Sequence, residues 1–156
     1  MMVSTLKGRF RAFEGAVRID EENPANSIVT AVIDVASIDT GVDQRDEHLR
    51  SDDFFNAAAF PKITFRSTKL GQAPGGDWKL TGDLAIRGVT KSVDLDVEFD
   101  GRGIDAFGKD RAGFSATTKI NRKDFGVNWN GLIEAGSGGV SDTVKIALNI
   151  AIVREG

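Results

Sequence analysis

Apolar and polar residues alternate along most of this chain with a period of two, which is the spacing of side chains on a β-strand. The alternation is clear at residues 143–153, where apolar Val144, Ile146 and Leu148 are separated by polar or small residues. Strands with a single apolar face are typical of antiparallel sheets, because such sheets cover a core with one side only. The pattern predicts strands over residues 27–36, 62–68, 78–86, 92–99, 112–120 and 143–153.

Turn-forming residues lie between the predicted strands. Arg87 and Gly88 separate two of them, and residues 100–103, Asp-Gly-Arg-Gly, follow the second. Short turns between consecutive strands predict hairpins. Strands of about ten residues, longer than the usual five or six, indicate a tall barrel or sandwich. A closed barrel of about eight strands has either a packed interior or room for one small ligand, and the alternation is compatible with both.

One segment breaks the strand pattern. Residues 43–50, Asp-Gln-Arg-Asp-Glu-His-Leu-Arg, contain no glycine and no β-branched residue, with acids early and an arginine last, which favours a short helix. Ser51 is expected to cap a second turn, and Pro61 to end the helical region before the next strand. Three phenylalanines then supply apolar surface, at positions 54, 55 and 60. We expect this insertion, near residues 43–57, to plug one end of a barrel, either completing the core or closing a hydrophobic cavity.

Composition and charge narrow the function. A chain of 156 residues with 40% hydrophobic and 28% charged residues is typical of one globular domain, which we expect to span residues 1–156. A net charge of −3 gives no electrostatic reason to bind nucleic acid or an anionic membrane. With no cysteine in the sequence, disulfides, thiolate metal ligands and cysteine nucleophiles are excluded.

Targeting signals do not fix the location of the protein. The first ten residues, MMVSTLKGRF, have no apolar core of a signal peptide, and no run of about 18 apolar residues predicts a membrane span. As written, the chain is expected in the cytoplasm. A periplasmic or secreted location would require an N-terminal segment preceding these residues.

Residue types that carry catalysis are sparse. His48 is the only histidine, and with Asp52 it has the i, i+4 spacing of two metal ligands on a helix. One histidine among exposed acids more commonly pairs with a neighbour. A Ser-His-Asp relay would need the same histidine, and no Gly-x-Ser-x-Gly elbow is present. We therefore expect no enzymatic activity, no metal site and no cofactor.

Several ordered blocks of the sequence resemble the YceI-like family of lipocalin-like proteins. The blocks are residues 3–10, 43–55, 60–65, 82–91 and 120–126, with Trp129 and Asn130 after the last. They span essentially the whole chain, which makes the resemblance more specific than one short motif. It implies an all-β, antiparallel, lipocalin-like barrel with a short helical insertion. It also implies an elongated apolar cavity for a polyisoprenoid, an isoprenoid quinone or a similar lipid, held by a carrier or storage protein without catalysis.

The chain departs from the family pattern at its start. Family members usually carry a first strand, with a Trp-x-x-Asp motif and a His-Ser pair, before the equivalent of residues 2–5; this chain begins where that strand would end. Either a preceding segment is missing from the sequence, or the barrel is open at one seam. An open seam exposes unpaired strand edges, which favours a homodimer or a wider cavity mouth.

The resemblance directs attention to two sets of residues. The candidate cavity wall consists of Ile63, Phe65, Leu80, Leu84, Ile86, Val93, Leu95, Val97, Phe114, Ile120, Trp129, Val144, Ile146 and Leu148. The candidates for the mouth, where a polar head group would need cations or helix N–H donors, are Arg45, His48, Arg50, Phe54, Phe55, Arg122 and Lys123. Residues 121–142 are a candidate lid. The alternatives are a stress-response or interaction scaffold with a filled core, and a lipid-modifying enzyme.

Overall fold

The computed structural model describes residues 8–18, 20, 22–72, 74–75, 77–104, 108, 110–128 and 142–153. Over these residues one seven-stranded sheet has the order β2-β3-β5-β6-β7-β8-β9, and β1 pairs with β4 in a separate two-stranded ribbon. The sheet consists of β2 (Phe13–Arg18), β3 (Ile28–Asp34), β5 (Lys62–Gln72), β6 (Trp78–Ile86), β7 (Val89–Ile104), β8 (Asp110–Asn121) and β9 (Thr143–Val153). The ribbon consists of β1 (Arg9–Phe10) and β4 (Ile38–Asp39).

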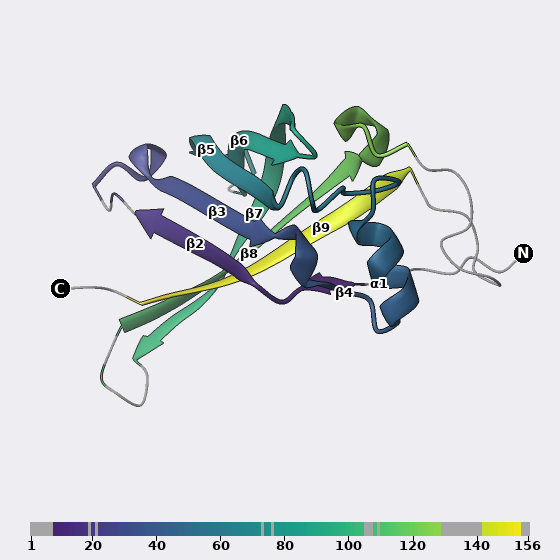
Figure 1. Ribbon diagram of the computed structural model, residues 1–156. Helices are drawn as coiled ribbons and strands as arrows, with labels where there is room; N and C mark the ends of the chain where they lie inside the picture. The colour runs from purple at the N-terminus through teal and green to yellow at the C-terminus, as the bar shows by residue number, and fades with distance from the viewer. Residues whose placement is uncertain are drawn as a thin grey trace, which may run out of the picture.

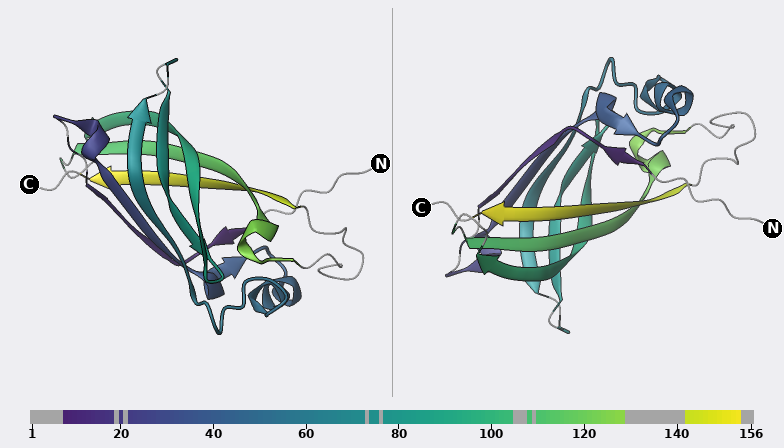
Figure 2. Two further views of the ribbon diagram at one scale, coloured as in Figure 1. Left: turned by 90° about the horizontal axis from the view of Figure 1, so that it is seen from above. Right: turned by 90° about the horizontal axis from the view of Figure 1, so that it is seen from below.

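Every ladder in the sheet joins neighbouring strands in antiparallel fashion. All six strands expected from the alternation are present, so the predicted antiparallel architecture is confirmed; the alternation did not predict β2. The sheet curls into a half-barrel, and α1 (Asp43–Arg50) lies at one end of it (Figures 1 and 2). Short 3-10 helices η1 (Pro24–Asn26), η2 (Val35–Ser37) and η3 (Arg122–Phe125) complete the elements.

The prediction of a turn at residues 100–103 was wrong. The strand β7 continues through this stretch to Ile104, and its register with β8 shifts between Phe99 and Gly101. Gly101 has φ +144°, a conformation that few other residues adopt. The glycines therefore mark a β-bulge inside one long strand, which is a second common meaning of glycine in a strand pattern.

The predicted helix was confirmed at residues 43–50, but it ends earlier than the expected 57. The Ser51 carbonyl accepts the Phe54 N–H at 3.0 Å and so begins a turn, but the Ser51 hydroxyl donates to the His48 carbonyl and does not cap that turn. Asn56 then takes a positive φ of 49°. Residues 52–59 therefore form turns instead of continuing the helix.

The hydrophobic core lies on one face of the sheet. Its buried members come mainly from the central strands and are Val35, Ile63, Phe65, Leu80, Leu84, Ile86, Leu95, Ala116 and Phe125. Phe65 lies across Gly82 of the neighbouring strand β6, where an added Cβ would be 2.4 Å from the Cζ atom of Phe65. The absence of a side chain at Gly82 therefore lets an aromatic ring fill the centre of this face.

A second, smaller cluster closes the end of the half-barrel where α1 lies. It contains Ile38, Leu49, Phe54 and Val127, with Phe10 and Phe55 packed against it. These residues come from β1 and β4, from α1 and the turns after it, and from the chain following η3. We call residues 43–60 together with residues 122–127 the end cap.

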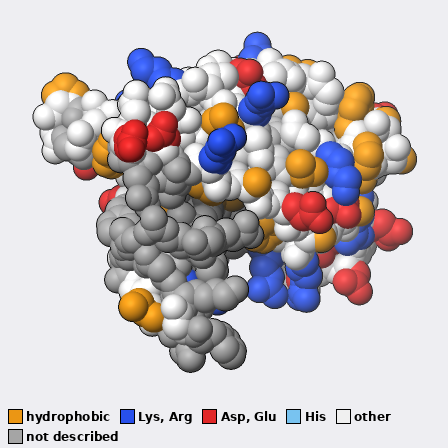
Figure 3. All heavy atoms as spheres, turned by 90° about the vertical axis from the view of Figure 1, so that its left-hand side faces the viewer, with side chains coloured by type: hydrophobic (Ala, Val, Ile, Leu, Met, Phe, Trp, Pro, Cys, Tyr) orange, Lys and Arg blue, Asp and Glu red, His pale blue; other side chains and the backbone are white. Residues whose placement is uncertain are grey.

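The charged and apolar side chains at the opposite end of the molecule are intermixed. Figure 3 views that end, and hydrophobic side chains reach the surface there between lysines, arginines and acids. No helix in the described ranges is both long and apolar enough to cross a membrane.

Candidate ligand-binding site

The structure brings the candidate wall residues together on the inner face of the sheet. Six of them are buried core members: Ile63, Phe65, Leu80, Leu84, Ile86 and Leu95. Five are partly buried and pack against that core: Val93, Val97, Ile120, Ile146 and Leu148. Phe114 and Val144 follow the same two-residue alternation on β8 and β9. Trp129, and with it residues 129–141 of the candidate lid, lies outside the described residues.

Sequence reasoning missed the part of this face that β2 and β3 supply. Val29, Ala31 and Ile33 pack against the core, and β3 also carries the outward Ile28 and Val32, which are exposed. Because β3 has apolar residues on both faces, its sequence does not show a period of two and does not indicate which face points toward the core. The register of the sheet identifies that face, because Ile33 lies opposite the buried Ile63.

Solvent exposure of the inner face increases toward its two edges. Leu84, on the central strand β6, is 6% exposed, whereas Phe13 on β2 is 61% and Val144 on β9 is 38% exposed. Phe13 is on the inner face because it lies opposite Ile33, and Val144 because it lies opposite Ile120. No ladder joins β2 to β9 among the described residues. Apolar surface on the inner face is thus accessible along both margins; the homodimer stays a prediction.

Polar contacts fix α1 to the segment before it. Asp46 is buried, and its carboxylate accepts hydrogen bonds from the backbone N–H (2.9 Å) and the hydroxyl of Thr40. Arg45 donates to the Thr40 hydroxyl (2.8 Å) and carbonyl (2.7 Å). Arg50 donates to the carbonyls of Ala36 (2.9 Å) and Ile38 (3.3 Å). Both candidate head-group arginines of the helix therefore bind backbone carbonyls.

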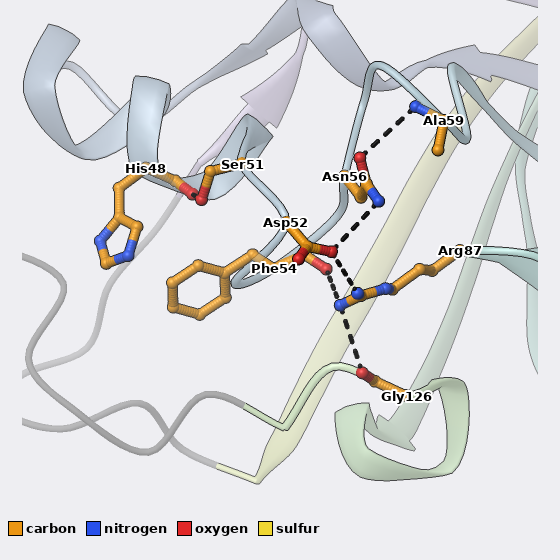
Figure 4. Close-up of polar contacts among 8 residues, drawn as sticks. All are labelled: His48, Ser51, Asp52, Phe54, Asn56, Ala59, Arg87 and Gly126. Carbon is orange, nitrogen blue, oxygen red and sulfur yellow. Dashed lines mark hydrogen bonds and ion pairs between the residues drawn. The ribbon is translucent and has the colours of Figure 1, made fainter.

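One arginine from the opposite side joins three parts of the molecule. Arg87, in the turn between β6 and β7, donates to Asp52 (2.8 Å) and to the carbonyls of Phe54 (3.0 Å) and Gly126 (3.4 Å), as Figure 4 shows. Asn56 donates to the same Asp52 carboxylate at 3.2 Å. The end cap is thereby tied to the sheet by a polar clamp, a role that the sequence pattern of a two-residue turn did not indicate.

His48 contacts residues of its own segment. Its Nε2 lies 2.8 Å from Asp53 Oδ2, and its ring meets the ring of Phe54 edge to face, with 5.1 Å between centroids. The expected neighbour Asp52 binds Arg87 instead. Within the part of the chain that the structure describes, no group of three or more metal-ligating side chains forms a metal site.

The phenylalanines of the mouth set pack inside the end cap. Phe54 is 2% exposed, and Phe55 is half-buried with its ring at 6.0 Å from Phe10, edge to face. Arg122 is also buried; it donates to the carbonyl of Val127 (2.7 Å) and to Asp142 (3.3 Å), and the latter also pairs with Lys123 at 3.4 Å. These contacts connect the two ends of the candidate lid. A head-group role for the mouth residues stays a prediction.

The ribbon of β1 and β4 carries a carboxyl whose pKa is lowered by its hydrogen bonds. Asp39 accepts a hydrogen bond from the Gly41 backbone N–H at 2.9 Å, and a second from Arg11. These bonds, chiefly the one from Gly41, hold the pKa of Asp39 below its usual value. The ion pair ties the chain before β2 to the strand that precedes α1.

Known proteins share this sequence and architecture. A family model described as YceI-like domain matches residues 1–152. The chain is similar to protein YceI of Escherichia coli, with 46% identity over 124 residues that cover 80% of this chain and 64% of that protein. It spans 66% of the length of a similar UPF0312 protein of Vibrio parahaemolyticus, with 43% identity.

Solved structures agree with this assignment. The YceI protein of Campylobacter jejuni superimposes with a TM-score of 0.84 and 30% identity, covering 100% of this chain and 89% of that chain. A polyisoprenoid-binding domain of Saccharophagus degradans, implicated in plant cell wall breakdown, has a TM-score of 0.67 at 22% identity, covering 92% of this chain and 83% of that one. The latter likeness is one of fold. From the family match and the shared curled sheet with its helix, this chain belongs to the YceI-like domain family.

Proposed function

We propose that this chain binds an elongated apolar molecule, such as a polyisoprenoid or an isoprenoid quinone, against the inner face of its sheet, as a carrier or store. The observation that supports the proposal most is the inner face itself. It is continuous from β2 to β9, buried at its centre and exposed at Phe13 and Val144. Exposed apolar margins beside a buried centre are a surface that a chain-like ligand would cover.

Burial of apolar area is sufficient to drive such binding. A long hydrocarbon ligand that loses several hundred Å² of accessible surface gains on the order of 10 kcal/mol, at about 25 cal/mol/Å², before the costs of ordering are subtracted. The binding needs no directional bond along the chain of the ligand. The inner face supplies aliphatic and aromatic side chains, which are suited to this kind of contact.

The ligand class is carried over from the comparisons as a proposal. The Saccharophagus degradans domain that shares this fold binds a polyisoprenoid, and the chain belongs to the same broad type of curled sheet. Fold likeness at that identity does not transfer a ligand by itself. The exposed apolar side chains at the two edges of the inner face are an independent reason to propose a polyisoprenoid-like ligand for this chain.

Binding without turnover is the proposed mode of action. The only histidine in the sequence, His48, is held by Asp53 and lies against Phe54, both from its own segment. Its ring is therefore in the end cap, away from the inner-face residues of the sheet. A general acid or base must lie within hydrogen-bonding distance of the reacting atom, and His48 is not placed to act in this way on a ligand at the inner face.

Lipid occupancy of matched variants tests the proposed function. The protein is purified from cells and examined by native mass spectrometry, and extracted lipid is identified. Leu148→Ser, on the inner face, should weaken lipid binding roughly thirtyfold and so lower occupancy, because about 2 kcal/mol of apolar contact is removed. Ala147→Ser, on the exposed face of the same strand, is the control and should retain it.

The outcomes separate the alternatives. A folded wild-type protein that carries no lipid and takes up neither geranylgeraniol nor a quinone would contradict the proposal and favour a scaffold with a filled core. Conversion of the lipid during incubation would favour a lipid-modifying enzyme. Equal losses in both serine variants would show that the inner face of β9 is not the site.

A further inference from the structure

The strands β7 and β8 separate at the end of the sheet that carries the end cap. Their ladder runs from Ile104 opposite Asp110 to Asp96 opposite Thr117, and stops there. Both strands continue, β7 back to Val89 in pairing with β6 and β8 on to Asn121 in pairing with β9. The left view of Figure 2 shows the two strands apart at this end, next to η3.

A side-chain hydrogen bond spans the separated strands. The Thr118 hydroxyl donates to the Asp94 carbonyl at 2.8 Å, where a regular ladder would have backbone bonds. The separation leaves a cavity of about 400 Å³. Its lining residues are Lys91, Ser92, Val93, Asp94, Thr118, Lys119, Ile120, Asn121, Asp124 and Phe125.

The base of this cavity is apolar and continuous with the core. Phe125 is a buried member of the core cluster, and Val93 and Ile120 pack against that cluster from the two separated strands. The cavity therefore connects the outside of the sheet to the inner face. A hydrocarbon chain placed in it would contact residues that belong to the proposed ligand-binding surface.

Two lysines flank the cavity. Lys91 lies opposite Leu84, which places it on the inner face, and no ion pair to it occurs among the described residues. Lys119 lies directly opposite Lys145 of β9, a like-charged cross-strand pair that costs free energy unless an anion is near. Of the two acids in the lining, Asp94 accepts a hydrogen bond from the Thr81 hydroxyl at 2.7 Å, and Asp124 lies in η3.

We propose that the gap between β7 and β8 binds the anionic head group of a single-chain amphiphile, whose chain passes over Phe125 to the inner face. This inference rests on the proposed function and names the polar end of its ligand. Lys91 on the inner face and Lys119 on the outer face provide ammonium donors from the two sides of the gap for a phosphate or carboxylate. Charge-assisted hydrogen bonds of this kind are strong. The end cap is a poorer entrance, since its arginines bind backbone carbonyls.

The test compares three probes with matched charge variants. The probes are geranylgeranyl pyrophosphate, geranylgeraniol and inorganic pyrophosphate, and their dissociation constants are measured on the full chain. The variant Lys91→Gln/Lys119→Gln should bind the lipid pyrophosphate at least about tenfold more weakly than wild type. It should bind the alcohol within about twofold of wild type, because the hydrocarbon contacts are unchanged.

Two further variants separate the role of the two lysines in the gap from a general effect of net charge. Lys69→Gln/Lys79→Gln makes the same change in net charge at exposed positions outside the cavity lining, and should leave all three constants near wild type. Lys91→Arg/Lys119→Arg keeps both charges and should preserve the preference for the lipid pyrophosphate. Circular dichroism of each variant confirms that it is folded.

Each result supports or overturns the inference. If both glutamine pairs weaken the lipid pyrophosphate equally, or neither does, the head group does not bind in the gap. If inorganic pyrophosphate binds as tightly as the lipid pyrophosphate, the gap is a site for a free anion and the inference is wrong. If the wild type binds the alcohol as well as the pyrophosphate, this inference falls while the proposed function stands. If it binds neither lipid, the proposed function falls.

Discussion

The guanidinium of Arg87 and the carboxylate of Asp52 meet at 2.8 Å, although 35 residues separate them in the sequence. The same guanidinium donates to the carbonyls of Phe54 and Gly126. A single side chain thus holds the turns after α1 and the chain after η3 against the β6–β7 turn. The end cap is consequently a fixed closure of the half-barrel at that end.

Removal of the clamp should cost more stability than removal of its acidic partner. Arg87→Ala leaves two carbonyls without their donor and should lower the free energy of unfolding by about 2–3 kcal/mol. Asp52 is 82% exposed, so Asp52→Ala should cost less than about 1 kcal/mol. Urea denaturation of both variants measures the difference. Equal losses would show that the ion pair, and not the carbonyl contacts, carries the clamp.

The contact of Phe65 with Gly82 predicts a large effect from one added methyl group. In Gly82→Ala the new Cβ would be 2.4 Å from the Phe65 ring and 2.6 Å from the Arg66 carbonyl oxygen. Such overpacking should lower the free energy of unfolding by about 2–3 kcal/mol. Gly103→Ala, in β7, meets no atom within 4 Å and should be near neutral. A stable Gly82→Ala protein would mean that the ring is not seated there.

The lowered pKa of Asp39 predicts how its contribution depends on pH. Since the folded-state pKa lies below the unfolded value of about 3.9, the stabilisation is complete above that pH and is lost as the pH falls through the folded-state pKa. The melting temperature of Asp39→Asn should therefore lie below that of wild type by a constant amount from about pH 7 to pH 5, and the difference should shrink below about pH 4. A difference that grows on acidification would contradict this sign.

Much of the sheet could be predicted from the sequence because its strands have one apolar face. β6 and β9 alternate cleanly, and the register of β6 with β7 follows from the short turn that joins them. β2 could not be predicted, since its six residues, Phe-Glu-Gly-Ala-Val-Arg, contain glycine and alanine and only two large apolar side chains. The bulge at Gly101 was mistaken for a turn because glycine serves both structures.

The polar end of the site could not be predicted from residue type. Arg45, Arg50 and Arg122 look like anion binders in the sequence, but each donates to a backbone carbonyl of the folded chain, and Arg122 also pairs with Asp142. Lys91 follows the turn at Arg87 and Gly88, and its residue type alone does not mark it as a ligand contact. Its place beside a gap depends on where the β7–β8 ladder ends, and that follows from tertiary packing around η3.

Photo-crosslinking with a diazirine-bearing prenyl alcohol tests the central claim most directly, namely that an apolar chain binds against the inner face. After irradiation, peptide mapping should place the label on inner-face residues such as Phe13, Leu148 and Val97, and excess geranylgeraniol should compete it away. Labelling confined to outward residues of the same strands, such as Ala147 and Asp96, or labelling that geranylgeraniol does not reduce, would contradict the account.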